Sequence, residues 1–256
     1  MRQWTAFMKK EMRELFRSGR LVVLLLLFCL FGVMNPAIAK LTPWMMELFS
    51  KQFEESGMVL STVEVTAMTA WMQFYKNMPM MLIVLIIMFG GTVVGELQKG
   101  ALIPVVAKGM KRQRILGAKA FTAAIVWTGG YFLSFAITYV YSAYFWDNGI
   151  AAHLFFGALC FWLFGLWLLS VIFAASGFAC SAAAVILTVG VGFMAVYILG
   201  FIPAVKPYTP AYLLETMPLL MGETAAGSYT VVLCVTAGLI VFNMFAGIWL
   251  FNRRQL

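Results

Sequence analysis

Six runs of mostly apolar residues, each close to the length of a membrane-spanning helix, constrain this chain more than any other feature. A helix needs about 20 such residues to cross the hydrocarbon core of a bilayer. Only 11% of the residues are charged, against about 25% in soluble domains. Ten-residue alternating segments, typical of transmembrane barrels, are absent. The sequence therefore predicts one all-α membrane domain over 1–256, with six transmembrane helices at about 21–39, 79–95, 120–144, 152–175, 182–202 and 229–251.

The first 18 residues have the pattern of an amphipathic helix. At about 100° per residue, one half of the helix carries Trp4, Phe7, Met8, Met12, Leu15 and Phe16. The other half carries Lys9, Lys10, Arg13, Glu14 and Arg17. Such a helix beside a span is expected to lie in the interface and contact membrane lipid. A cleaved signal peptide ending near Ala37–Ala39 is disfavoured, because the region before the apolar run is amphipathic and contains acids.

Two longer polar intervals separate the spans on one side. Asn35-Pro36 is expected to kink or end the first span. The interval 40–77 predicts one or two short surface helices, with Trp44 and Trp71 near the headgroups. Ser61 and Glu64 have capping-box spacing, which indicates a helix start. The proline-containing interval 203–228 predicts further short helical pieces.

The basic residues divide unequally between the two sides. One side holds 14 of the 18, namely Arg2, Lys9, Lys10, Arg13, Arg17, Arg20, Lys99, Lys108, Lys111, Arg112, Arg114, Lys119, Arg253 and Arg254. The positive-inside rule then predicts that both termini and the 96–119 segment face the cytoplasm. The net charge of +8 follows this sidedness, so no nucleic-acid partner is expected.

Residue patterns for enzymatic chemistry are missing from the sequence. It contains no phosphate-binding Gly-Lys-Ser/Thr, no Gly-x-Ser-x-Gly and only one histidine, and its four cysteines lie in or beside apolar runs. No catalytic, cofactor or metal site is therefore predicted. The spans carry essentially no ionisable residues, which disfavours a proton- or sodium-driven carrier. Energy for uphill transport would have to come from another protein.

Within the spans, two features are candidates for helix packing or for a translocation path. Gly91 and Gly95 form a GxxxG pattern, which lets two helix backbones approach closely. Asn243 is the clearest polar residue in the last span, and an interhelical hydrogen bond is its expected role.

The segment 96–119 is the longest charged interval between two apolar runs. Glu96 ends a span, Gly100 permits a sharp turn, and a short apolar patch from Leu102 precedes a basic cluster. A short amphipathic helix here could dock into a groove of a soluble partner. The alternative is a solvated loop that serves only the positive-inside rule.

This segment resembles a pattern in permease subunits of type-2 ABC exporters. There, E-x-x-x-G-T-L, a basic cluster and I-x-x-x-K lie between the second and third spans; here the matching residues are Glu96, Gly100, Leu102, Ile115 and Lys119. Ala101 replaces the usual Thr, and Lys108–Met110 replaces a proline-containing turn, which leaves the local loop shape open. The N-terminal helix resembles the elbow helix of that family. The stretches Gln73–Asn77 and Tyr208–Leu213 resemble recurrent features of its small bacterial members.

The resemblance implies a half-transporter in the bacterial plasma membrane. It would pair with a second, identical or similar permease and with two copies of a separate ATPase subunit that binds ATP and Mg. The coupling helix would lie in 96–119, with contacts from Glu96, Gly100, Leu102, Lys108, Lys111, Arg112, Ile115 and Lys119. The short turn with Ser176, Gly177 and Ser181 would be a second cytoplasmic contact.

The substrate and the function class stay open at the sequence level. An amphipathic drug, peptide or lipid would suit adaptable surfaces of 18 Met and 23 Phe, although these residues could equally face lipid and core. Sodium- or metal-linked ABC efflux is one alternative. A non-transporting immunity or sensor protein that binds a partner is another. An intramembrane enzyme is disfavoured, because no nucleophile–base pair is visible.

Overall fold

The computed structural model describes residues 2–54 and 65–254, with side chains described for 4–48 and 65–254. Across these residues the chain is helical and has no strand. The elements are α1 (Arg2–Arg17), α2 (Arg20–Glu54), α3 (Ala67–Gly90), α4 (Thr92–Gln98), α5 (Ile103–Ala107), α6 (Arg112–Phe145), η1 (Asn148–Ile150), α7 (Leu154–Ser176), α8 (Ala182–Leu199), η2 (Lys206–Tyr208), η3 (Pro210–Leu214), α9 (Met217–Leu220), η4 (Ala226–Tyr229) and α10 (Thr230–Arg253).

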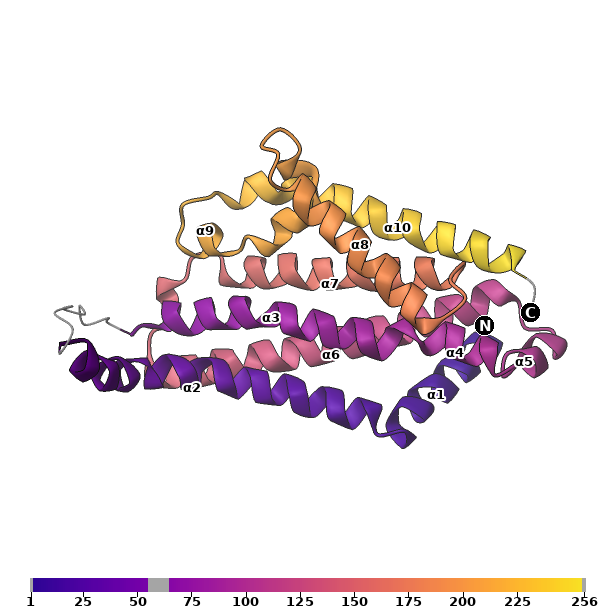
Figure 1. Cartoon of the computed structure of the whole chain (residues 1–256), viewed down its shortest axis with the longest axis horizontal. Helices are drawn as coiled ribbons and strands as arrows, with labels where there is room; N and C mark the ends of the chain where they lie inside the picture. Colours follow the sequence, from indigo (N-terminus) through magenta and orange to yellow (C-terminus); the bar gives the residue numbers. More distant parts are fainter. Residues whose placement is uncertain (1, 55–64, 255–256) are drawn as a thin grey trace.

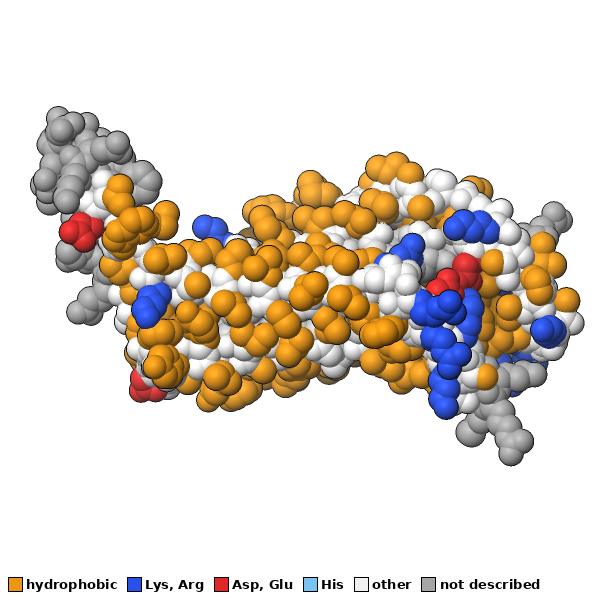
Figure 2. Space-filling view, turned by 90° about the horizontal axis from the view of Figure 1, so that it is seen from below, with side chains coloured by type: hydrophobic (Ala, Val, Ile, Leu, Met, Phe, Trp, Pro, Cys, Tyr) orange, Lys and Arg blue, Asp and Glu red, His pale blue; other side chains and the backbone are white. Residues whose placement is uncertain are grey.

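Six of the described segments are long and apolar enough to cross a membrane, which supports a multi-pass membrane protein. They run beside one another along the molecule, and both chain ends lie at one end of the bundle with α1, α4 and α5 (Figure 1). In Figure 2 an apolar belt ends at a band of Lys and Arg side chains with acids among them. We call this end the basic end and the opposite one the far end.

The core is centred on α7, which packs against α10, α6, α8 and α3, while α2 packs against α6 and α3. At two glycines, an aromatic ring of a neighbouring helix packs directly against the backbone. A Cβ on Gly165 would lie 2.2 Å from the ring of Trp127, and one on Gly130 would lie 2.3 Å from the ring of Phe28. The spans at α8 and α10 are the least buried, so much of their apolar surface faces outward.

The first span is longer than predicted. Helix α2 continues through Pro36 and Pro43 to Glu54, so of the two predicted effects of Asn35-Pro36, a kink or a helix end, the helix end is wrong. Proline has no N–H and would leave the carbonyl four residues earlier, that of Gly32, unpaired. In the structure the Thr138 hydroxyl of α6 donates to the Gly32 carbonyl at 3.0 Å. A neighbouring helix thus supplies the missing donor, which is how spanning helices tolerate proline.

Within the described parts of the interval 40–77, residues 40–54 and 65–77, no separate surface helix is present. Its first part extends α2, and its last part is the beginning of α3, which starts at Ala67. Trp71 is fully buried instead of lying near headgroups, and its Nε1 donates to Asn148 Oδ1 at 3.1 Å. Trp44, by contrast, is 60% exposed. The predicted cap at Ser61 and Glu64 lies outside the described residues.

The second span is divided in two. Helix α3 ends at Gly90, Gly91 is a turn residue between the two helices, and α4 carries the last turns to Gln98. The third helix begins at Arg112 rather than near 120, so the final part of the 96–119 segment, including Lys119, is helical. Between spans five and six the expected short pieces are η2, η3, α9 and η4.

Candidate functional site: a buried ion-pair cluster at the basic end

Lys119 is the centre of an ion-pair cluster that joins three elements. It lies on the second turn of α6, and its side chain is only 3% exposed. Its Nζ donates to Glu11 Oε2 of α1 at 2.7 Å and to Glu96 Oε1 of α4 at 2.8 Å. A buried ammonium is tolerated only when it is paired and hydrogen-bonded. These contacts therefore hold α1 and α4 on the first turns of α6.

A second ammonium closes the cluster on its solvent side. Lys10 Nζ lies 2.9 Å from Glu14 Oε2, 3.2 Å from Glu11 Oε1 and 3.5 Å from Glu96 Oε1. Partial burial lowers the pKa of Lys10, but the hydrogen bond with Glu14 and the charges of Glu11 and Glu96 outweigh it, so the pKa is raised overall. The hydrogen bond from Lys10 lowers the pKa of Glu14. Both groups are charged at neutral pH.

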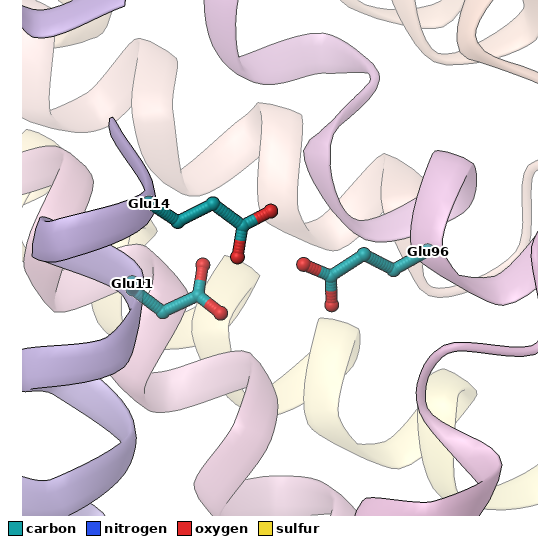
Figure 3. A group of neighbouring side chains, drawn as sticks. All are labelled: Glu11, Glu14 and Glu96. Carbon is teal, nitrogen blue, oxygen red and sulfur yellow. The ribbon is translucent and has the colours of Figure 1, made fainter. Parts of the chain in front are cut away.

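The three carboxylates are close enough to share one cation. One oxygen from each of Glu11, Glu14 and Glu96 lies within 4.8 Å of the others. Figure 3 shows the Glu14 and Glu96 side chains pointing toward one another from α1 and α4, with Glu11 beside them. In the structure the positive charge among them comes from Lys10 and Lys119. A metal ion would have to displace these ammonium groups, so the cluster is better described as a salt-bridge network.

Glu11 was not among the residues predicted for this site, because it does not lie on the polar half of the N-terminal helix. Glu11 is four residues after Phe7 and four before Leu15, and both of these are buried. Residues four apart share one helix face. A single carboxylate in the middle of an apolar face was therefore the available signal of a buried partner.

The spacing between Glu96 and Gly100 has a direct structural explanation. Gly100 has φ +66°, a left-handed conformation that other residues adopt at a cost. The amide of Ala101 donates to the Glu96 carbonyl at 3.0 Å, and the amide of Ile103 donates to the Gly100 carbonyl at 3.1 Å. Gly100 thus ends α4 four residues after Glu96 and turns the chain into α5.

A short helix, α5, forms in this segment, but it is not the amphipathic helix that was predicted, because its five residues are all apolar and the cations Lys108 and Lys111 follow it. Leu102 and Met110, which flank it, are buried and anchor it to the bundle. Ile103 is 55% exposed, and Lys108 and Lys111 are exposed as well. The segment therefore presents exposed apolar residues, of which Ile103 is the largest, together with exposed lysines, while its buried residues attach it to the bundle.

Two other predicted coupling residues have structural contacts. Ile115 is fully buried on α6. The Arg112 guanidinium donates to the backbone carbonyls of Asn252, at 3.4 Å, and of Arg254. Arg112 therefore binds the end of α10 to the start of α6.

The second predicted contact, the turn between α7 and α8, is attached to the same end. Gln98 of α4 donates to the Cys180 carbonyl at 2.8 Å. Arg254 donates to the carbonyls of Ala179 at 2.7 Å and Ser176 at 3.4 Å. The turn and the 96–119 segment are thus parts of one surface.

Each residue predicted in this turn has a local role. The Ser176 hydroxyl is buried and donates to the Ile172 carbonyl at 2.8 Å. A Cβ on Gly177 would lie 2.8 Å from the Gly247 carbonyl oxygen, so this glycine lets α7 and α10 approach closely. Ser181 caps α8, because its side chain accepts a hydrogen bond from the Ala184 amide.

Of the three residues predicted to pack between spans, Gly91 and Asn243 contact a neighbouring helix in the described part of the chain and Gly95 does not. A Cβ on Gly91 would lie 3.2 Å from Ala182, whereas one on Gly95 would meet nothing within 4 Å. Gly95 therefore makes no close helix contact among the described residues. Asn243 donates to the Ser170 hydroxyl of α7 at 3.0 Å, which confirms the expected interhelical hydrogen bond.

No protein-family model matches this chain, and no curated protein matches it either. At the basic end, a small exposed helix lies between α4 and α6, which buried ion pairs join to each other and to α1. This arrangement can transmit a displacement; the described residues there include no nucleophile–base pair.

Proposed function

We propose that this chain is the permease subunit of an ATP-driven ABC exporter in the bacterial plasma membrane. It would work with a second permease and with two copies of a separate ATPase subunit that binds ATP and Mg. The basic end would face the cytoplasm, since it carries most of the Lys and Arg residues. The chain itself would not be an enzyme, and an amphipathic drug, peptide or lipid is the proposed substrate class.

The observation that carries the proposal is the link between α5 and the buried cluster. Between Glu96 and Lys119 the chain leaves α4, forms the exposed α5 and enters α6, and these two residues are joined by a 2.8 Å ion pair at the base of the loop. Lys119 also holds Glu11 of α1. A force on α5 would therefore move α4, α6 and α1 together rather than bend the loop alone.

The turn with Ser176, Gly177 and Ser181 supports the same function. Because Gln98 and Arg254 bind its carbonyls, a partner that contacts α5 would also reach this turn. Phe178 in the turn is 52% exposed and Ile103 of α5 is 55% exposed. Two exposed apolar side chains among cations suit a partner groove with an apolar floor and an acidic rim.

The first experiment asks whether an ATPase co-purifies with the tagged chain from bacterial membranes in mild detergent. We expect a subunit with ATPase activity to be retained by the wild type and lost in Ile103→Asp and Lys111→Glu. Lys40→Glu is the control, because Lys40 lies at the far end and packs over the Phe145 ring. All variants should reach the membrane in equal amounts.

Two outcomes would reject the proposal. Retention of the same ATPase, with equal stimulation of its activity, in Ile103→Asp and Lys111→Glu would exclude α5 as the contact. Co-purification of a partner without ATPase activity would favour an immunity or sensor protein instead. Orientation is tested separately with a Lys111→Cys variant that lacks the native cysteines, which should resist membrane-impermeant thiol reagents in intact cells.

A further inference from the structure

The corner between α1 and α2 carries a group of exposed arginines. Helix α1 ends at Arg17, and α2 begins at Arg20. Gly19 has φ +72°, which lets the chain turn sharply from one helix into the other (Figure 1). Arg13 lies one turn before Arg17 on the same face of α1, and all three arginines are exposed. The corner therefore concentrates positive charge from two helices at the basic end.

Two adjoining cavities lie at this corner. The first has a volume of 470 Å³ and is lined by five residues of α1 and the turn after it: Lys10, Arg13, Glu14, Arg17 and Ser18. Three of these, Lys10, Glu14 and Ser18, also line the second cavity, of 250 Å³, which is bordered by Arg20 of α2. All five residues of the first cavity are exposed, so a ligand from outside can reach them.

The first cavity has an excess of positive charge that the chain leaves uncompensated. Its only acid, Glu14, is paired with Lys10 at 2.9 Å. No described side chain forms an ion pair or hydrogen bond with the guanidinium of Arg13, Arg17 or Arg20. Guanidinium groups match the oxygens of a phosphate with paired, charge-assisted hydrogen bonds. The cavity therefore suits a phosphate group.

The end of α1 does not need these arginines to complete its backbone hydrogen bonds. Cations in the last turn of a helix often bind its final carbonyls. Here the Ser18 amide donates to the Glu14 carbonyl at 2.9 Å, and its hydroxyl donates to the Leu15 carbonyl at 3.2 Å. The Gly19 amide donates to the Phe16 carbonyl at 3.1 Å. The turn thus satisfies the helix end, and the arginine side chains are available for a ligand.

An apolar stripe leads from the corner along α2. Val23, Leu26, Leu30 and Val33 are spaced by three and four residues, so they share one helix face, and they are between 44% and 64% exposed. The stripe starts one turn after Arg20. Figure 2 shows the apolar belt of the molecule ending at a band of Lys and Arg side chains. A ligand with a phosphate head and an apolar tail would match both parts, whereas a soluble anion would use only the first.

We propose that the corner between α1 and α2 binds the headgroup of an anionic phospholipid such as phosphatidylglycerol. Arg13 and Arg17 donate hydrogen bonds to its phosphate, Arg20 adds charge beside it, and an acyl chain lies along the stripe of α2. A zwitterionic phospholipid has a cation in its headgroup that the excess positive charge repels, so the site prefers lipids with a net negative charge. The proposal requires only that the chain lies in a membrane and does not depend on coupling to an ATPase.

Native mass spectrometry of the full chain in detergent micelles tests the proposal, with phosphatidylglycerol and phosphatidylcholine of identical acyl chains as probes. We expect phosphatidylglycerol to bind about tenfold more tightly. Arg13→Gln and Arg17→Gln should each weaken its binding about fivefold, because each cation near a membrane surface contributes about that factor. The double variant should bind the two lipids about equally.

Arg253→Gln is the matched control. Arg253 is an exposed arginine at the same end, but it packs over the Trp249 ring and lines neither cavity. This variant should bind phosphatidylglycerol as the wild type does. Arg13→Gln and Arg17→Gln should keep the wild-type unfolding temperature, since neither arginine has a partner among the described side chains. Equal affinity of the wild type for the two lipids, or equal losses in Arg13→Gln and Arg253→Gln, would overturn the proposal.

A soluble form of the headgroup decides whether the site takes a lipid or a free anion. Glycerophosphoglycerol has the same phosphate and glycerol groups but no acyl chains, so it cannot use the stripe of α2. We expect it to displace phosphatidylglycerol only at concentrations at least about a hundredfold higher than that of the lipid, because it buries no tail. Displacement at equal concentration would show that the corner takes a soluble anion and would reject a lipid site.

Discussion

Two ion pairs with equal N–O distances lie at opposite ends of this bundle and differ in how deeply they are buried. Lys119–Glu11 at the basic end and Lys206–Glu215 at the far end both have N–O distances of 2.7 Å. The first pair is 3% and 10% exposed, the second 37% and 44%. Distance alone therefore says little about the role of an ion pair, because burial decides what its loss would cost.

The two ends also differ in the kinds of side chain that join their helices. At the basic end, charged side chains also hold backbone carbonyls, as Arg254 does in the turn after α7. At the far end, neutral groups make several of the connections, such as Trp71 with Asn148 and Asn77 with Asn35, at 3.1 and 2.8 Å. We infer that charge is concentrated where the proposed partner acts, while the far end is joined by aromatic and amide contacts.

The largest expected effect comes from removing the central cation of the cluster. Lys119→Met leaves Glu11 and Glu96 with only the longer contacts to Lys10, at 3.2 and 3.5 Å. Breaking a buried pair in this way costs about 3–5 kcal/mol of the free energy of unfolding. Lys206→Met, which breaks the exposed pair of the same length, should cost no more than about 1 kcal/mol. Chemical denaturation in detergent micelles measures both.

A compensated variant makes this comparison sharper. Replacing all three charges, as Lys119→Met, Glu11→Leu and Glu96→Gln, removes the buried charges together with their desolvation cost. We expect it to recover most of the stability lost in Lys119→Met, yet to lose stimulation of the proposed ATPase partner. If Lys119→Met and Lys206→Met proved equally mild, the distinction between the two ends would be wrong.

A second comparison concerns backbone packing of α7 at its two ends. A Cβ on Gly177 would lie 2.8 Å from the Gly247 carbonyl oxygen, whereas one on Gly157 would lie 3.2 Å from the Tyr75 hydroxyl. Backbone atoms of α10 cannot yield as a side-chain end can. Gly177→Ala should therefore cost about 1–3 kcal/mol, and Gly157→Ala less than about 1 kcal/mol.

The same denaturation assay measures these two variants, with Gly95→Ala as the reference. Gly95 has open space at its Cβ position, so its alanine variant should be neutral or slightly stabilising. A cost for Gly95→Ala similar to that for Gly177→Ala would mean that Gly95 contacts a second chain in solution.

Much of the architecture could be predicted from the sequence, because the length and apolarity of a run determine whether it can span a membrane. The continuation of α2 past Pro36 could not, since it depends on Thr138, a residue of another helix, satisfying the Gly32 carbonyl. Similarly, the GxxxG spacing of Gly91 and Gly95 does not say which face meets a neighbour, and only Gly91 does so among the described residues.

Only part of the candidate site could be predicted from the sequence. Glu96, Gly100 and Lys119 stood out by spacing, and the left-handed turn at Gly100 explains that spacing. The pairing of Lys119 with Glu11 is a contact between residues 108 positions apart, which no local pattern reports. Lys119 is part of a helix because α6 begins at Arg112, before the apolar run, and it is buried because its partners Glu11 and Glu96 come from α1 and α4.

The smallest expected effect is a pH dependence at the solvent side of the cluster, where Lys10 and Glu14 are half-exposed. The pKa of Glu14 is lowered from 4.5 by its hydrogen bond with Lys10. A carboxylate whose pKa falls on folding stabilises the folded state above its unfolded pKa, and this contribution is lost as pH falls through the folded pKa.

The pKa of Lys10 is raised, so its contribution is present below 10.5 and is lost only at higher pH. The pair should therefore add a constant, small stabilisation between about pH 5 and 10. Unfolding temperatures of the wild type and Glu14→Gln should differ slightly and constantly in that range and converge below pH 4.5. If the two curves instead stay parallel through the acid range, Glu14 does not contribute through its charge, and the solvent side of the cluster is no different from an exposed pair at the far end.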